Sequence, residues 1–248
     1  MSALQTIIFS VCLCAYAISF QTSHAAAGYF VEVVHGCTTS GPACAKIRAR
    51  PSATSALIKE ARIGVVLEVD QEVHVGEDVW YRIRHDTQLR YPERVTGRWY
   101  IHGKFVRVLL QEGKQEIQPR MQVPNGKKIV VTISEQNLVA YENDEVFLSA
   151  KVSTGLKVTP TPRGVFTIFK KQPSRYMQGP LPYISQKYYD LPGVPWTMYF
   201  TEQGAAIHGA YWHTSFGKRY SSGCVNLPPD TARILYEWAE LGTLVVIK

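Results

Sequence analysis

The sequence predicts a mainly β fold with a single appreciable helix. Short runs in which apolar and polar residues alternate recur along the 248-residue chain, and a period of two is typical of half-buried strands. Turn-forming residues such as Asn143-Asp144 separate these runs. The composition, with 46% hydrophobic and 19% charged residues, is that of an ordinary globular protein and not of a disordered one.

The first set of predicted strands lies within residues 28–110 and predicts a first β domain. It comprises residues 29–34, 63–69, 79–83, 99–101 and 105–109. Residues 84–96 are polar, and we interpret them as a loop or hairpin tip inserted between two of these strands. The polar, turn-prone residues 111–126 predict a linker to the rest of the chain.

The second set of strands lies in residues 127–248 and predicts a second β-rich domain. It comprises residues 128–134, 137–141, 146–153, 165–170, 198–200, 205–208 and 243–247. The sequence Pro-Pro-Asp at 228–230 favours the start of a helix over residues 231–240, and Gly242 favours its end. Residues 171–197 contain five prolines, which we expect to prevent a long regular element and to leave a structured loop or lid.

The first 27 residues have the features of a secretory signal peptide. They contain no Lys, Arg, Asp or Glu, and an apolar core over residues 7–20 is followed by small residues suited to cleavage. The apolar run is too short for a typical transmembrane helix. An uncleaved anchor stays open, because the amino terminus carries the only positive charge of the segment. We therefore expect an exported protein, in the periplasm or on the cell-wall side of the cytoplasmic membrane.

The formal net charge of +7 is spread over the chain, and no basic run is longer than two residues. Nucleic-acid binding predicts clustered basic residues with interleaved aromatic residues, and the sequence lacks this pattern. We therefore expect no nucleic-acid partner. Diffuse positive charge fits contact with an anionic cell wall, and it fits the absence of such a contact equally well.

Three cysteines follow the predicted signal peptide, and two of them are close in sequence. Cys37 and Cys44 flank a turn-rich segment, so a disulfide between them is favoured in an oxidising compartment, where it would contribute roughly 2–3 kcal/mol. Two buried free thiols are the alternative. No further Cys or His pair stands at ligand spacing, which argues against a zinc site. We expect no metal, and we also expect no cofactor. Cys224 is left as a lone thiol.

Cys224 stands in the sequence Ser-Ser-Gly-Cys-Val-Asn at 221–226, sixteen residues after His208. A thiol attacks as its thiolate, so a histidine that accepts the thiol proton is the minimum equipment for nucleophilic acyl chemistry. Gly223 allows the backbone to approach a substrate, and the amides near it can form an oxyanion hole. An inert core thiol and a structural histidine are the alternatives.

The segments His-Gly-Ala-Tyr-Trp-His at 208–213 and Ser-Ser-Gly-Cys-Val-Asn at 221–226 resemble the active-site signature of the L,D-transpeptidases, the enzymes with a YkuD-like catalytic domain. Val-Ser-Thr-Gly at 152–155 and residues 159–166 resemble the approach strand and turn of the same family. One position departs from the family pattern, because Ser222 stands where a second histidine is usual.

Within residues 28–110, the order of four short segments resembles a bacterial SH3-like domain; these are 46–52, 64–69, 80–83 and 97–100. Together the two resemblances imply an SH3-like β-barrel over 28–110, followed by a YkuD-like catalytic domain over 127–248 with a C-terminal helix. The SH3-like module is the candidate for anionic cell-wall contact. We expect it to be dispensable for chemistry on a soluble peptide.

The resemblance implies a cysteine-dependent acyltransferase, a peptidoglycan L,D-transpeptidase. Cys224 would attack a tetrapeptide stem, release D-alanine and pass the acyl group to an amine, which forms a 3–3 cross-link. In this reaction His208 would be the proton donor and acceptor, and Gly223 would lie in the oxyanion-hole region. An L,D-carboxypeptidase and a catalytically impaired wall-binding protein are the alternatives. We assign substrate binding to Gly209, Trp212, Ser222, Asn226 and Tyr199. Packing alone also explains Trp212.

Overall fold

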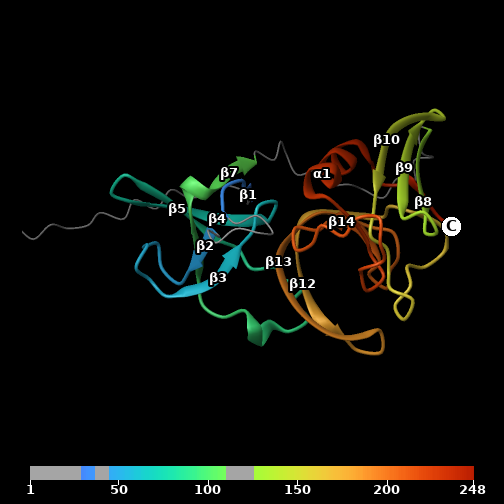
Figure 1. Cartoon of the computed structure of the whole chain (residues 1–248). Coiled ribbons are helices and arrows are strands. Elements are labelled where there is room, and N and C mark those ends of the chain that lie inside the picture. Colours follow the sequence, from blue (N-terminus) through green and yellow to red (C-terminus); the bar gives the residue numbers. More distant parts are fainter. Residues whose placement is uncertain (1–28, 37–44, 110–125) are drawn as a thin grey trace, which may run out of the picture.

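The structure is a computed structural model that describes residues 29–36, 45–109 and 126–248 (Figure 1). The predicted signal peptide, the Cys37–Cys44 pair and nearly all of the predicted linker lie outside the described residues. The mainly β class is confirmed, because the described chain forms three sheets and one α-helix. No helix among these residues is long and apolar enough to cross a membrane.

The N-terminal module, residues 29–109, is a single antiparallel sheet. Its strands are β1 (Tyr29–Val33), β2 (Ala45–Arg48), β3 (Leu57–Ala61), β4 (Val66–Val75), β5 (Asp78–Ile83), β6 (Trp99–His102) and β7 (Val106–Leu109). Their order is β3-β2-β6-β5-β4-β1-β7. The sequence predicted five of these strands and missed β2 and β3. Strand β3 lies at the edge of the sheet and has no alternating buried face. The end strands β3 and β7 are not paired with each other, so the SH3-like barrel stays a prediction.

The C-terminal part, residues 126–248, contains two sheets and the helix. One sheet has the order β10-β9-β8-β16-β11, with β8 (Lys127–Thr132), β9 (Asn137–Glu142), β10 (Glu145–Lys151), β11 (Gly164–Thr167) and β16 (Leu244–Ile247). The other has the order β12-β13-β14-β15, with β12 (Lys170–Leu181), β13 (Ser185–Tyr199), β14 (Ala206–Gly209) and β15 (Val225–Leu227). Helix α1 (Pro229–Trp238) packs on β13 and β14 and buries Ala232 and Leu235.

The expectation that five prolines prevent a regular element over residues 171–197 is wrong. Strands β12 and β13 form a long antiparallel hairpin through this segment. Pro173 and Pro180 lie on β12, which is an edge strand of its sheet and needs no ladder partner on one side. Pro192 and Pro195 lie on β13 before Met198 and Tyr199, through which β13 pairs with β14, so this part of β13 is also paired on one side only. The register of the β12–β13 pairing also shifts, once between Arg175 and Met177. Such a shift interrupts the regular series of backbone hydrogen bonds between the two strands.

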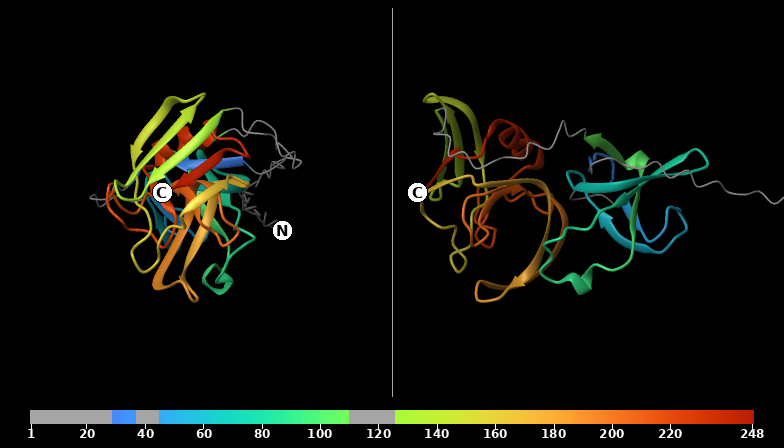
Figure 2. Two further views of the ribbon diagram at one scale, coloured as in Figure 1. Left: turned by 90° about the vertical axis from the view of Figure 1, so that its right-hand side faces the viewer. Right: turned by 180° about the vertical axis from the view of Figure 1, so that it is seen from behind.

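The two parts of the chain share their apolar cores. One cluster fills the space between the C-terminal sheets and α1, and it also includes Phe30 and Val66 of the N-terminal module. The other fills the N-terminal sheet and includes Tyr176, Val194 and Tyr211 from the C-terminal part. Each part therefore completes the core of the other, and the hairpin β12–β13 lies between them (Figures 1 and 2).

Polar contacts join the hairpin to the loop over residues 84–95 of the N-terminal module, which includes a single 3₁₀ turn, Pro92–Arg94. Asp86 forms an ion pair with Arg175 and accepts a hydrogen bond from the amide of Tyr176 at 3.0 Å. The side chains of Asp86 and Arg175 are only 14% and 12% exposed. A buried charge that loses its partner is strongly destabilising, so this pair fixes the position of the loop on the hairpin.

We expect Asp86→Ala to lower the free energy of unfolding by about 3–5 kcal/mol, because it leaves the Arg175 guanidinium buried without its carboxylate. Urea unfolding of the full chain measures this. Asp78→Ala is the matched control, since the Asp78 carboxylate is 62% exposed and pairs with His102; exposed pairs contribute about 1 kcal/mol or less. Equal losses in the two variants would contradict the structural role given to Asp86.

Candidate active site

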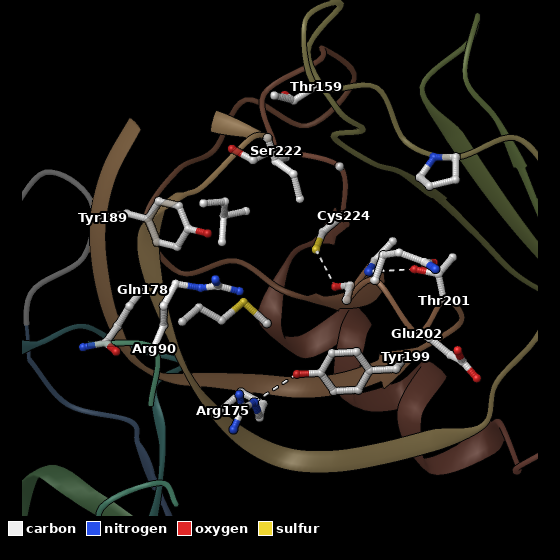
Figure 3. Close-up of a pocket in the computed structure, with 18 of the residues that line it drawn as sticks. Arg90, Thr159, Arg175, Gln178, Tyr189, Tyr199, Thr201, Glu202, Ser222 and Cys224 are labelled. Carbon is white, nitrogen blue, oxygen red and sulfur yellow. Dashed lines mark hydrogen bonds between the residues drawn. The ribbon is translucent and has the colours of Figure 1, made fainter. Parts of the chain in front are cut away.

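A cleft of about 1140 Å³ contains Cys224 (Figure 3). Its lining comes from five segments of the chain: the loop 222–224, the segment 158–162, the turn 201–205, the hairpin with its flanking residue Phe169, and the N-terminal loop residues 88–90. Strands β13 and β14 pair next to β15, so the sheet brings the turn 201–205 against the loop that carries Cys224.

Hydrogen bonds within residues 221–224 fix the loop before Cys224. Ser221 Oγ donates to the carbonyl oxygen of Cys224 at 2.5 Å and accepts from the amide of Gly223 at 3.2 Å. Gly223 has a φ of +119°, a backbone conformation that L side chains rarely adopt. The glycine of the motif is therefore required by the backbone, and Ser221, two residues before it, closes the turn.

The segments 152–155 and 159–166, which the sequence analysis associated with the site, lie beside this loop. Ser153 forms a bridge with Asn226, and Gly155 forms one with Ser221. A Cβ atom on Gly155 would be 2.2 Å from the carbonyl oxygen of Thr159, so only glycine fits there. Thr161 donates to the carbonyl oxygen of Cys224 at 3.4 Å. The loop is thus held from both sides.

The Cys224 side chain is part-buried at the cleft, and its Sγ lies 3.8 Å from the carbonyl oxygen of Gly204. Burial raises the pKa of the thiol, because the thiolate is less well solvated there, and a backbone hydrogen bond from Ala206 opposes this in part. The resting side chain is therefore the thiol at neutral pH.

His208 lies on β14 next to β15, paired with Asn226 in a parallel ladder, and is 2% exposed. Its Nδ1 is 3.0 Å from the carbonyl oxygen of Gly209. A carbonyl only accepts, so Nδ1 carries the proton and Nε2 is the free base. Burial lowers the pKa of His208 to about 4, so the ring is neutral at pH 7. In the described part of the chain, no hydrogen bond joins His208 to Cys224.

His213 is bound at both ring nitrogens. The amide of Ser215 donates to Nδ1 at 3.1 Å, so the proton of the neutral ring is on Nε2. Nε2 lies 3.0 Å from the Asn226 amide group, whose oxygen otherwise has no partner, and the arrangement that satisfies both groups directs that oxygen toward Nε2. His213 and Asn226 therefore form a buried structural pair behind the site.

The structure separates the five residues assigned to substrate binding. Ser222 and Tyr199 line the cleft, and Tyr199 accepts a hydrogen bond from Arg175 at 2.9 Å. Gly209, Trp212 and Asn226 do not line it. Gly209 packs so closely on β13 that a Cβ would be 2.8 Å from Pro195. Substrate binding by these residues stays a prediction, and for Ser222 and Tyr199 it is one that the cleft geometry favours.

Two cleft residues that sequence reasoning missed are Tyr189 and Arg90. Burial is the largest cause that raises the pKa of the Tyr189 hydroxyl, the charge of Cys224 raises it further, and the charge of Arg90 opposes both. No local motif marks either residue, because they come from the hairpin and from the N-terminal loop. Among the residues that the structure describes, no group of three His, Cys, Asp or Glu is placed to hold a metal ion.

Comparison with known proteins gives a consistent result for the C-terminal part. Residues 126–247 match the family model of the L,D-transpeptidase catalytic domain, YkuD. A Bacillus licheniformis protein named as a YkuD L,D-transpeptidase is 29% identical over 103 residues, which are 40% of this chain and 52% of that protein. The chain thus spans about half the length of this relative. The family model and the relative support an L,D-transpeptidase catalytic domain here.

Solved structures of the same kind are also similar. A mutant L,D-transpeptidase of Enterococcus faecium has 28% identity and a TM-score of 0.45, with 50% of each chain covered. An L,D-transpeptidase from Mycobacterium smegmatis has 22% identity and a TM-score of 0.48, with 69% of this chain and 91% of that chain covered.

The two buried histidines make stability depend on pH. The pKa of each is lowered to about 4, with burial the largest cause, whereas an unfolded histidine titrates near 6.5. Between these values the unfolded chain binds more protons, so the free energy of unfolding should fall as the pH falls from about 6.5 to about 4, by at most ~1.4 kcal/mol per pH unit for each histidine. Urea unfolding across this range measures the slope, and His208→Gln should reduce it. An unchanged slope in that variant would contradict the burial effect.

Proposed function

We propose that residues 126–247 form the catalytic domain of an L,D-transpeptidase that acts on peptidoglycan stem peptides, with Cys224 as its nucleophile. The observation that carries this proposal is the position of Cys224. It lies at the cleft, directly after a glycine with a required positive φ and beside the strand of a neutral histidine. All of these residues fall within the segment that matches the family model.

In the proposed first half-reaction, Cys224 Sγ attacks the carbonyl carbon of the third residue of a tetrapeptide stem. The thiol proton passes to Nε2 of His208, directly or through one water, because Nδ1 is already protonated and bound to Gly209. The bond to the terminal D-alanine breaks, and its nitrogen takes the proton from the imidazolium. The products are a thioester on Cys224 and free D-alanine.

In the second half-reaction, a side-chain amine of another stem attacks the thioester. The amine loses a proton, the Cys224 thiolate leaves and is protonated again, and a 3–3 cross-link results. Because the resting thiol and imidazole are both neutral, the proton moves during attack and no thiolate–imidazolium pair is stored beforehand. Water in place of the amine gives an L,D-carboxypeptidase.

The developing oxyanion requires backbone donors near Cys224. The amide of Gly223 is engaged by Ser221 Oγ at 3.2 Å in the resting loop. The amide of Cys224 has no such partner among the described residues, and it is the donor that we assign to the oxyanion. In this proposal Gly223 contributes through its backbone conformation, which shapes the turn just before that amide.

Incubation of the protein with a disaccharide-tetrapeptide, followed by mass analysis, tests the proposal. Cross-linked dimer is expected for a transpeptidase, and tripeptide alone would show a carboxypeptidase. Cys224→Ala should abolish both products while leaving the unfolding midpoint nearly unchanged, because no other thiol among the described residues can replace it. A variant that still turns over would contradict the nucleophile, and an inert wild type would favour the impaired wall-binding protein.

His208 and Ser222 should differ sharply in their importance. We expect His208→Ala to reduce turnover by at least about 10²-fold, the low end for loss of a general acid–base group. Ser222→Ala should change turnover less than tenfold, because Ser222 lines the cleft but cannot hold a proton near neutral pH. Steady-state kinetics with the same stem peptide measures both. If Ser222→His alone switched acylation on, the native chain would be an impaired enzyme.

A further inference from the structure

The N-terminal module forms part of the wall of the cleft. Residues 88–90 of its loop line the same space as Cys224. The expectation that residues 28–110 are dispensable for chemistry on a soluble peptide does not account for this arrangement, because it treats the module as separate from the site. We therefore ask which of residues 88–90 could contact a ligand in the cleft.

The loop is fixed on both sides of Arg90. Before it, the carbonyl oxygen of Gln88 accepts from Arg175 at 3.2 Å. After it, Tyr91 and Gln178 exchange two hydrogen bonds, from the Tyr91 amide at 2.8 Å and to the Tyr91 carbonyl at 3.0 Å. The Tyr91 hydroxyl donates to the carbonyl oxygen of Pro180 at 2.8 Å. The backbone at Arg90 is thus held in place between two anchored residues.

Arg90 differs from the other cations that line the cleft, because its guanidinium has no ion-pair or hydrogen-bond partner among the described residues. The Arg175 guanidinium is paired with Asp86, and the Lys170 ammonium donates to Gln88 at 3.1 Å. Among the described residues Arg90 forms no ion pair and no hydrogen bond through its guanidinium. The nearby Arg94 shows the structural alternative, since it donates to the carbonyl oxygen of Gly179 at 2.6 Å and stacks on Tyr91. Arg90 makes no contact of that kind with the residues that the structure describes.

Tyr189 is close enough to both Arg90 and Cys224 for its pKa to respond to each of them. The charges of both Cys224 and Arg90 act on the pKa of the Tyr189 hydroxyl, in opposite directions. Figure 3 shows the three side chains around one hollow, with Arg90 directed into it from the loop side. A guanidinium presents several donors in a planar fork that matches a carboxylate. An anionic group of a ligand bound at Cys224 could therefore meet Arg90.

We propose that Arg90 of the N-terminal module binds the C-terminal carboxylate of the tetrapeptide, so that the module completes the substrate site. This rests on the proposed function, in which the residue that leaves carries this carboxylate. Arg90 acts here as a specificity residue: it holds the end of the acyl donor beyond the bond that breaks and favours a free carboxylate over a neutral end.

Kinetics with two peptides tests the assignment. Arg90→Gln should raise KM for the tetrapeptide and lower kcat/KM about 10- to 100-fold, the range for a hydrogen bond to a charged group. Against the C-terminal amide of the same peptide, the wild type should already be slow, and Arg90→Gln should cost little more. Arg98→Gln is the matched control, because Arg98 belongs to the same module and is exposed like Arg90 but does not line the cleft. Equal losses with acid and amide, or in both variants, would overturn the proposal.

A second measurement does not depend on enzymatic activity. Cys224 can be alkylated by the anion iodoacetate and by the neutral iodoacetamide, and the ratio of the two rates reports positive charge near Sγ. Arg90→Gln should lower this ratio severalfold, and Arg98→Gln should leave it unchanged. A changed ratio in a protein that turns over no peptide would support the anion site and contradict the proposed function. An unchanged ratio would overturn the role of Arg90, whatever the activity.

Discussion

The buried contact between the N-terminal loop and the hairpin β12–β13 determines how the rest of the molecule is arranged. Asp86 and Arg175 compensate each other's charge in a place from which water is largely excluded, and such a pair is stable only when both partners are present. Around it, each part of the chain inserts apolar side chains into the core of the other. The cleft wall that faces Cys224 is therefore built from both parts.

A second constraint is the electrostatic state of Cys224, the proposed nucleophile. Burial keeps the thiol of Cys224 protonated and the imidazole of His208 neutral, so the proposed reaction begins from two uncharged groups. The hydrogen bond between His208 Nδ1 and Gly209 settles which nitrogen is the base. The protein thus supplies a fixed tautomer and a fixed backbone turn, and in the proposed mechanism charge separates only during the reaction step.

The proline-rich hairpin shows how tertiary structure overrode a local rule. Proline lacks an amide donor, which argues against a regular strand when the sequence is read alone. On an edge strand such as β12, and in the part of β13 that is paired with β12 alone, a missing donor leaves the ladder intact on the paired side. The same hairpin then presents Tyr189 and Tyr199 to the cleft and binds the N-terminal loop, so the element that was hardest to predict contributes most to the shape of the site.

The sequence by itself determined the mainly β class, most strand positions, the C-terminal helix and the candidate pair Cys224 and His208, because these depend on local alternation and on a motif of short span. It did not determine that Arg90 lines the cleft, that Asn226 is buried against His213, or that Gly209 is a packing position. Those facts depend on which distant segments meet. Only the tertiary structure decided them, since contacts between elements far apart in the chain leave no periodic signal in either segment.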